Sequence, residues 1–452
     1  MERGAKAQRW SKSDILNGME KSPKILIITY YWPPAGGIAV KRWLSLSNQF
    51  AGLNAEVHVL TLEKESAEYH SIDAGLLDSV DSRISVHRIR AWNPFQLTKK
   101  LFKKHIPPQG FSLNTEGQKG VNLLTRLRSN LFIPDPRKTW NNQAVKKALE
   151  IVDSYGIDTM ITTSPPHSVQ LIGKRVAHKS NVKWVADFRD PWTDIFYYEQ
   201  LGHSLVSRKI DRRLERCVLD KANAVTTVSW GFQSLLHGKV SHRNLEDFHV
   251  IPNGIDGNIL SPKAPDLEQV FRVVYTGMLT DIYEIEPFLE SVASHNASPG
   301  VRLIQFDFYG SVPPHYQQRL ERTFSFIHFH GNRSMEEIPG IQQAADGLFL
   351  AGPKQYNSGH IPGKLFEYLR ASRSIFYLGE EESDVHRILH ETDSGRLFNR
   401  KDVASFPAIL GEEVKRMGFN LDEEDREQKL SSYFRSNQAK DYLRIVQGLH
   451  SK

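Results

Sequence analysis

Short runs of apolar and β-branched residues recur along the chain, and segments with helical spacing of apolar positions separate most of them. Continuous runs of this kind are typical of strands in a parallel sheet, where helices cover both faces. A first series of predicted strands lies at 24–31, 56–61, 84–89, 158–163, 183–188 and 224–229. A second series lies at 271–277, 303–310, 326–331, 347–351 and 374–379. Two consecutive series predict an α/β protein with two doubly wound domains facing a central cleft.

The order of these elements also predicts the domain boundaries. Residues 1–22 are polar and are expected to form a disordered tail, followed by a first Rossmann-like domain over 23–249 that contains an atypical insertion at about 92–137. A hinge-like segment then opens the second domain, which covers 250–424. The charged helical pattern of 425–452 predicts a helix that returns to the first domain.

Composition limits the class of protein. At 452 residues the chain is too long for one core, and 40% hydrophobic with 24% charged residues is ordinary for a soluble protein. The net charge of +6 favours anionic partners: phosphorylated substrates, anionic lipid surfaces or nucleic acid. The dispersed basic residues disfavour nucleic acid. Cys217 is the only cysteine, which excludes an intrachain disulfide and fits a cytoplasmic protein.

Membrane contact is expected to be peripheral. No run reaches the roughly 18 apolar residues of a transmembrane helix. Residues 95–104, within the insertion, combine apolar and basic residues at helical spacing, which suits a helix lying on an anionic membrane surface. The alternative is a solvated basic face over a local hydrophobic cluster. A cytoplasmic protein at the inner face of the cell membrane is therefore one expectation.

The stretch 358–369 carries the clearest candidate chemistry. It is a Gly/Pro-rich loop that feeds into a helix, whose free N–H groups and positive dipole end can bind an anion. Lys364 and Glu367 share one face of that helix. A cation suits a diphosphate and a carboxylate suits the hydroxyls of a sugar, so the pair suits a nucleotide sugar. The alternative is a capped helix whose Lys and Glu are ordinary surface residues.

A second glycine loop follows the first predicted strand. Gly36 and Gly37 separate that strand from a helical pattern, an arrangement that can cradle a phosphate at the carboxyl edge of a parallel sheet. Arg42 lies on the first turns of the helix, where it can contact a phosphate or a surface acid. Taken alone, two glycines after a strand are more often a plain structural turn, which is the alternative here.

Titratable side chains gather at two later strand ends of the first domain. His167 follows the strand at 158–163, and Asp187, Arg189 and Asp190 end the strand at 183–188. Parallel sheets bind ligands at these ends, so the four residues are candidates for catalysis. A structural Asp187–Arg189 clamp is the alternative.

Taken together, four motifs in order resemble the retaining nucleotide-sugar glycosyltransferases of family 4, which have the GT-B fold. The motifs are residues 31–37, 250–256, 275–277 and 361–369, and the resemblance covers roughly 24–449. Residues 186–192 are similar to those of bacterial members that make surface polysaccharides. The resemblance implies that Gly36 and Gly37 face the donor diphosphate, with Gly277 beside it. It also implies that Glu367 holds the ribose, that Lys364 neutralises the leaving group, and that no metal or other cofactor is needed.

The chain departs from the family pattern at three places. Gly359 replaces the family's first glutamate, Met278 and Leu279 replace an Arg and a Lys, and Arg189-Asp190 stands where many members carry His-Asp. Other residues must therefore make part of the contacts to the donor. The nearest candidates for these contacts are Lys364, His360, Arg333 and Tyr356. Catalytic roles fall on Asp190, Arg189, Lys364 and His167, and acceptor contacts on Arg42, Asp187 and Trp192.

The expected activity is transfer of a sugar from a UDP-sugar or GDP-sugar to a glycan or lipid-linked acceptor in cell-surface polysaccharide synthesis, with retention at the anomeric carbon. Two alternatives stay open. One is a GT-B nucleotide-sugar epimerase, which would recruit Asp187 and Asp190 for proton abstraction. The other is a catalytically weak nucleotide-sugar-binding scaffold subunit, which the lost glutamate motivates.

Overall fold

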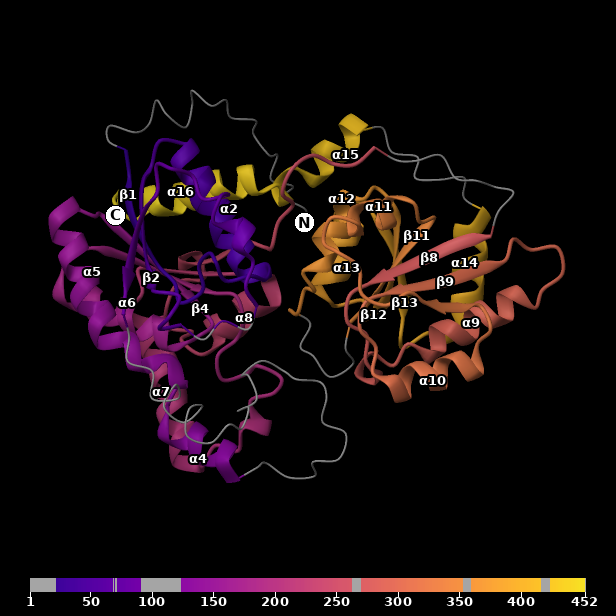
Figure 1. The fold of residues 1–452 in the computed structure, drawn as a ribbon, viewed down its shortest axis with the longest axis horizontal. Helices are drawn as coiled ribbons and strands as arrows, with labels where there is room; N and C mark the ends of the chain where they lie inside the picture. The colour runs from indigo at the N-terminus through magenta and orange to yellow at the C-terminus, as the bar shows by residue number, and fades with distance from the viewer. Residues whose placement is uncertain are drawn as a thin grey trace.

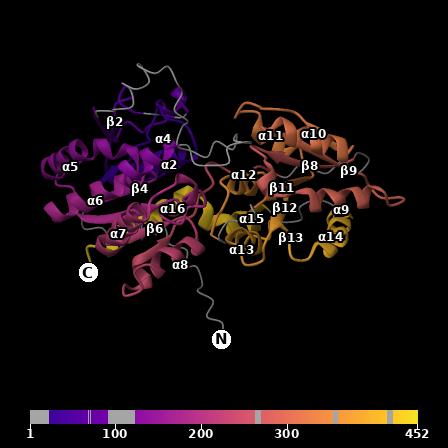
Figure 2. The same ribbon diagram turned by 90° about the horizontal axis from the view of Figure 1, so that it is seen from below.

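The chain forms two parallel α/β sheets, each covered by helices, as the doubly wound prediction requires (Figures 1 and 2). The computed structural model describes residues 22–67, 69, 71–90, 123–261, 270–352, 359–415 and 423–451. The predicted tail up to residue 21, most of the predicted insertion with its segment 95–104, and Tyr356 lie outside these residues.

The first sheet has seven strands in the order β3-β2-β1-β4-β5-β6-β7, and all its pairings are parallel. Its strands are β1 Lys24–Ile28, β2 Glu56–Leu62, β3 Ser85–Ile89, β4 Thr159–Ser164, β5 Lys183–Phe188, β6 Ala224–Thr227 and β7 Phe248–Val250. Its helices are α2 Ile38–Gly52, α4 Leu123–Leu131, α5 Asn141–Tyr155, α6 Ser168–Lys179, α7 Leu205–Lys221 and α8 Trp230–Gly238. A 3₁₀ turn, η2 Pro136–Trp140, precedes α5.

The second sheet has six parallel strands in the order β10-β9-β8-β11-β12-β13. Its strands are β8 Phe271–Thr276, β9 Ile304–Tyr309, β10 Ile327–Phe329, β11 Gly347–Ala351, β12 Ser374–Gly379 and β13 Gly395–Asn399. Its helices are α9 Glu286–Asn296, α10 Pro314–Thr323, α11 Ile338–Gln343, α12 Lys364–Arg370, α13 Asp384–Glu391 and α14 Phe406–Lys415. The chain ends with α15 Glu423–Leu430 and α16 Arg435–Gly448.

Burial on both faces explains why the central strands read as continuous apolar runs. In β1, Leu26 and Ile28 pack into one core cluster, while Ile25 and Ile27 pack into the cluster on the opposite face. The sequence prediction missed β13, because only Phe398 of this edge strand is buried and no apolar run marks it. It also opened the second domain at Val250, which is the last residue of β7 and pairs with β6 in the first sheet.

Two chain crossings join the domains and run side by side. The Ile255 N–H donates to Tyr433 O at 2.7 Å, and the Arg435 N–H donates to Ile255 O at 3.1 Å. After the second crossing, α16 packs on α2, with the Tyr442 ring 5.6 Å from that of Trp43 (Figure 1). The C-terminal helix therefore belongs to the core of the first domain.

Candidate active site at the domain junction

In the second domain, the carboxyl ends of β8 and β9 converge on Lys364. Gly277 and Gly310 follow these strands with φ values of 113° and 140°, which favour glycine. A Cβ at Gly310 would lie 2.0 Å from Gly277 O, and a Cβ at Gly277 would lie 3.2 Å from Lys364 Nζ. The two strand ends thus pack backbone against backbone, and the end of β8 lies beside Lys364.

Lys364 itself is held by Tyr275. Its Nζ donates a hydrogen bond of 2.6 Å to the Tyr275 hydroxyl and lies 3.9 Å from the centroid of that ring. Burial lowers the pKa of Lys364 to about 7, and the nearby Glu367 carboxylate opposes this shift only in part. A half-buried amine with a lowered pKa can regain its proton when an anion binds beside it.

The glycine loop of the first domain reaches the start of α12. Gly37, with φ of 103°, precedes α2, whose first residue is Ile38. A Cβ at Gly363 would lie only 2.7 Å from Ile38 Cδ1. The Ile38 side chain, directly after Gly37, therefore packs against Gly363, although more than 300 positions separate the two loops in the sequence.

A second contact between the domains involves Gly359 and Gly231. A Cβ at Gly231 would lie 2.6 Å from Gly359 Cα, and a Cβ at Gly359 would lie 2.7 Å from the backbone nitrogen of Phe232. Any larger residue at 359 meets the first turn of α8. This contact gives a physical reason for glycine at the position where the family pattern has glutamate.

Sequence reasoning missed the side chains that accompany this contact. Asp384 Oδ2 accepts a hydrogen bond of 2.8 Å from the Gly231 N–H, and the Arg387 guanidinium lies 3.9 Å from the centroid of the Trp230 ring. The glycine at the start of α8 was visible in the sequence, but its partner lies 153 residues away.

The remaining donor-site candidates lie around the same loops. Glu367 is exposed on α12, one turn after its start. Burial lowers the pKa of the half-buried His360 to about 4. The exposed Arg333 guanidinium lies 5.8 Å from the centroid of the Tyr309 ring, which stacks on His330.

The first domain contributes His167, Arg189 and Asp190 beyond β4 and β5. The His167 ring stacks on Trp192 at 5.1 Å, and its Nδ1 is buried without a hydrogen-bond partner. Burial, with the charges of Arg189 and Lys239, lowers the pKa of His167 to about 3, whereas burial raises the pKa of Asp190. The imidazole is therefore neutral at physiological pH.

Aromatic and charged groups that the sequence analysis did not single out surround this trio. Burial raises the pKa of Tyr31, which also feels the charges of Arg137, Asp135 and Arg189. Burial likewise raises the pKa of Tyr197, with a further contribution from Asp190. Tyr31 was visible only as part of the loop motif after β1, and the others carried no motif.

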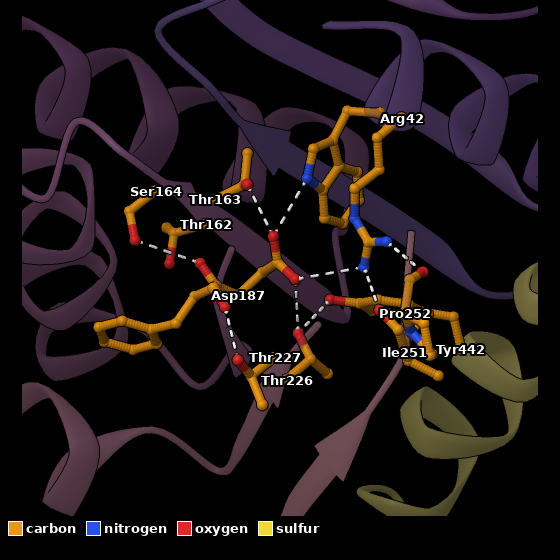
Figure 3. A network of polar contacts seen from close by, with 12 residues as sticks. Arg42, Thr162, Thr163, Ser164, Asp187, Thr226, Thr227, Ile251, Pro252 and Tyr442 are labelled. Carbon is orange, nitrogen blue, oxygen red and sulfur yellow. Dashed lines mark hydrogen bonds and ion pairs between the residues drawn. The ribbon is translucent and has the colours of Figure 1, made fainter. Parts of the chain in front are cut away.

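The acceptor contacts expected of Arg42 and Asp187 are not supported, because both side chains are wholly buried (Figure 3). Arg42 donates hydrogen bonds to Pro252 O at 2.6 Å and Ile251 O at 2.8 Å. It also forms an ion pair of 3.8 Å with Asp187. Asp187 accepts hydrogen bonds from Trp43, Thr163 and Thr226. Thr226 in turn contacts the Tyr442 hydroxyl at 2.8 Å.

This network connects α2, β4, β5, β6, the interdomain segment and α16, so its role is structural. It also replaces the predicted Asp187–Arg189 clamp, since Arg189 instead donates to Pro165 O at 2.8 Å. Trp192 is likewise buried, and its Nε1 donates to Asp211 at 2.7 Å. An acceptor contact is therefore not supported for Trp192 either.

Among the described residues, no three His, Cys, Asp or Glu side chains are placed to hold a metal ion. No family model matches the sequence, and no curated protein matches it.

Solved structures do resemble the chain over nearly its whole length. The Anabaena protein HepE in complex with UDP has a TM-score of 0.58 at 12% identity, covering 94% of this chain and 100% of that chain. A sucrose-phosphate synthase from Thermosynechococcus elongatus gives 0.57 at 14% identity, covering 95% and 99%. The lipopolysaccharide outer core galactosyltransferase WaaB gives 0.57 at 11% identity, covering 94% and 99%. The two domains thus have the GT-B fold of glycosyltransferases.

Proposed function

We propose that this protein is a retaining, metal-independent glycosyltransferase that uses a nucleoside diphosphate sugar. The observation that carries the proposal is the position of Lys364. It lies beside the bare backbone of Gly277 in its own domain, and its neighbour Gly363 packs against Ile38, which follows the glycine loop of the other domain. A cation beside bare glycine backbone suits a diphosphate.

The donor is proposed to be a UDP-sugar, with a GDP-sugar as the second choice. UDP and UDP-glucose are bound in the HepE structures, which share the fold. In this proposal Glu367 accepts hydrogen bonds from the ribose hydroxyls, and His360 and Arg333 contribute to the remainder of the donor site. Gly359 leaves no side chain for the sugar, so sugar recognition rests on its neighbours.

Lys364 would act on the leaving group. As the bond between the sugar C1 and the phosphate oxygen breaks, negative charge develops on the diphosphate, and the ammonium stabilises it. The acceptor hydroxyl attacks C1 from the same face, and the departing phosphate oxygen takes its proton. We assign this stabilisation to Lys364 and not to the start of α12. The N–H groups of Leu365 and Phe366 in this short helix already donate to Pro362 O and Gly363 O, so they are not available to the diphosphate.

The acceptor would bind against the first domain. The half-buried His167 is neutral and feels the charge of Arg189, and these two residues, with the adjoining Asp190, are the polar groups proposed to meet the acceptor. We propose a glycan or lipid-linked acceptor of the cell envelope; WaaB, which shares the fold, is by its name a galactosyltransferase of the lipopolysaccharide outer core. No helix in the described part of the chain has the length and apolar content that a membrane span requires.

Calorimetric titration tests the donor site. UDP, GDP, ADP and dTDP are titrated into the wild type, Glu367→Ala and the control Glu321→Ala, which removes an exposed carboxylate on α10. One diphosphate is expected to bind, and Glu367→Ala is expected to weaken it by about tenfold to hundredfold, as for a lost hydrogen bond to a charged group. Equal affinity in all three proteins would refute the role of Glu367.

Turnover of the matching nucleotide sugar separates the proposed function from its competitors. Transfer to an acceptor with retained anomeric configuration supports the proposal. Epimerised free donor would identify an epimerase, and donor binding without turnover would identify a scaffold subunit.

A further inference from the structure

The outward face of α7 exposes large apolar side chains. Leu205 is 85% exposed, Val206 69% and Ile210 45%. Beside the first turn of α7, the helix α4 exposes Leu127 and Leu131. Figure 1 shows both helices at the same end of the first domain. Single exposed leucines are normal on a monomer, but a group of five on two adjoining helices calls for a partner.

Cations share this outward face of α7. Lys209, Arg212, Arg213 and Arg216 are exposed, and at 100° per residue they lie on the same side of the helix as Leu205, Val206 and Ile210. The acidic residues of this stretch point inward, with Asp211 and Glu215 each 1% exposed. Over residues 205–216 the face therefore carries four positive charges and no acid. Asp220, farther along α7 on the same side, is partly exposed and pairs with Lys221 and His242.

The inward acids are engaged in the domain itself. Asp211 accepts hydrogen bonds from Trp192 and Tyr198, and Glu215 accepts from Thr193 and Lys239. These bonds fix the rotation of α7 about its axis, so the apolar and basic residues must face away from the domain.

Polar contacts also fix the start of α7 to α4. Ser204 caps the helix through a hydrogen bond from the Ser207 N–H at 3.1 Å. Asn130 of α4 accepts from the Ser204 N–H at 2.7 Å and from the Ser207 hydroxyl at 2.6 Å. The exposed apolar residues thus belong to two helices that are hydrogen-bonded to each other, and the start of α7 is capped.

We propose that this surface docks on an anionic lipid bilayer; we name it the α4–α7 face. It consists of Leu127, Leu131, Leu205, Val206, Lys209, Ile210, Arg212, Arg213 and Arg216. Apolar side chains beside arginines and lysines match the boundary between acyl chains and anionic headgroups. A second copy of this chain that bound through the same face would place its four cations against these four, which would repel it. A nucleic acid would leave five apolar side chains in water.

This inference deepens the proposed function, since a lipid-linked acceptor is presented at a membrane surface. It is independent of the segment 95–104, which the sequence analysis nominated for membrane contact and which lies outside the described residues. Its test needs no sugar transfer, so the two proposals fail separately.

Vesicle co-sedimentation with the full-length protein tests the inference. The vesicles are phosphatidylcholine with or without phosphatidylglycerol, at low and high salt. Three variants are compared with the wild type. The charge variant replaces Lys209, Arg212, Arg213 and Arg216 with Gln, the apolar variant replaces Leu205, Val206 and Ile210 with Ser, and a third variant replaces Lys99, Lys100, Lys103 and Lys104 with Gln. A control of equal net charge to the charge variant replaces Lys146, Lys179, Arg319 and Arg322 with Gln.

The wild type is expected to bind the phosphatidylglycerol vesicles, and high salt is expected to weaken this binding. Each cation near an anionic leaflet contributes about five-fold, so the charge variant should lose up to several hundred-fold in partitioning. The apolar variant should also lose binding, whereas the control should bind like the wild type. UDP affinity and unfolding temperature unchanged from the wild type establish that the variants are folded.

Several results would overturn the inference. One is that the wild type does not bind the vesicles. A second is that the control loses as much vesicle binding as the charge variant. A third is that only the variant at residues 99–104 loses vesicle binding. Wild-type dimers that the apolar variant abolishes, without vesicle binding, would identify a second copy as the occupant. RNA binding that only the charge variant abolishes, without vesicle binding, would identify nucleic acid. Vesicle binding without any nucleotide binding would leave this inference standing and refute the proposed function.

Discussion

The Gly231 N–H donates a hydrogen bond of 2.8 Å to the Asp384 carboxylate, and this bond joins the first turn of α8 in one domain to α13 in the other. A carboxylate at a helix N-terminus satisfies a free N–H and complements the helix dipole. Arg387 on the next turn of α13 lies over Trp230, so α13 contacts α8 through a carboxylate and a cation together. The two domains therefore meet through a specific contact beside the donor loops.

Removing this contact should loosen the junction. Asp384→Ala leaves the Gly231 N–H without its acceptor and is expected to lower the free energy of unfolding by about 1–2 kcal/mol, as for a lost helix cap. Urea denaturation measures the change. Asp402→Ala, at an exposed aspartate of the same domain, is the control and should be neutral. Equal stability of the two variants would show that the interdomain bond does not persist in solution.

Gly359 should not tolerate a side chain. Gly359→Ala places a Cβ 2.7 Å from the Phe232 nitrogen, so α8 and the donor loop must separate. An overpacking cost of about 1–3 kcal/mol is expected, together with weaker nucleoside diphosphate binding, measured by denaturation and calorimetry. Gly340→Ala is the matched control, because a Cβ there meets nothing within 4 Å. Wild-type affinity in Gly359→Ala would contradict the close packing of these loops.

Binding of a nucleoside diphosphate should take up a proton through Lys364. In the free protein its pKa is lowered to about 7, so above that pH the amine is mostly neutral. A bound diphosphate favours the ammonium and raises the pKa, so affinity should fall as pH rises above about 7, by up to about tenfold per pH unit. Calorimetry in buffers of different ionisation enthalpy measures the proton uptake.

Lys364→Met is the variant that tests this assignment. It keeps the length of the side chain without its charge, so the proton uptake should disappear. The value of kcat/KM should fall by about a hundredfold to a thousandfold, as for removal of a group that stabilises developing charge. Proton uptake that persists in Lys364→Met would assign the titration to another group.

The buried Arg42–Asp187 pair should govern stability rather than acceptor binding. Asp187→Ala leaves the Arg42 guanidinium buried without its carboxylate and is expected to cost about 3–5 kcal/mol of unfolding free energy. Asp220→Ala, which removes an exposed pairing with His242, should cost at most about 1 kcal/mol. An acceptor KM that changes in Asp187→Ala while stability does not would restore the acceptor role.

The amino-acid sequence by itself determined the class of fold, because strands covered by helices on both faces appear as short runs of mostly apolar and β-branched residues. The central strands of both sheets were predicted, and so were the edge strands β3 and β10. The edge strand β13 was not, because Phe398 is its one buried residue and no apolar run marks it. The loop glycines were also readable, because a strand end whose backbone must stay bare requires glycine, as at Gly277.

Only the tertiary structure decided which polar residues face the domain junction and which are buried beneath it. Arg42, on the first turns of α2, and Asp187, at the end of β5, have the residue types of a ligand site, but packing against the interdomain segment and α16 buries them, and α16 comes from the far end of the chain. The partnership of Gly231 with Asp384 and the outward rotation of α7 likewise depend on contacts between residues distant in sequence or on opposite faces of one helix. Local patterns specify how a segment folds, whereas the surroundings of a charged group depend on everything that packs around it.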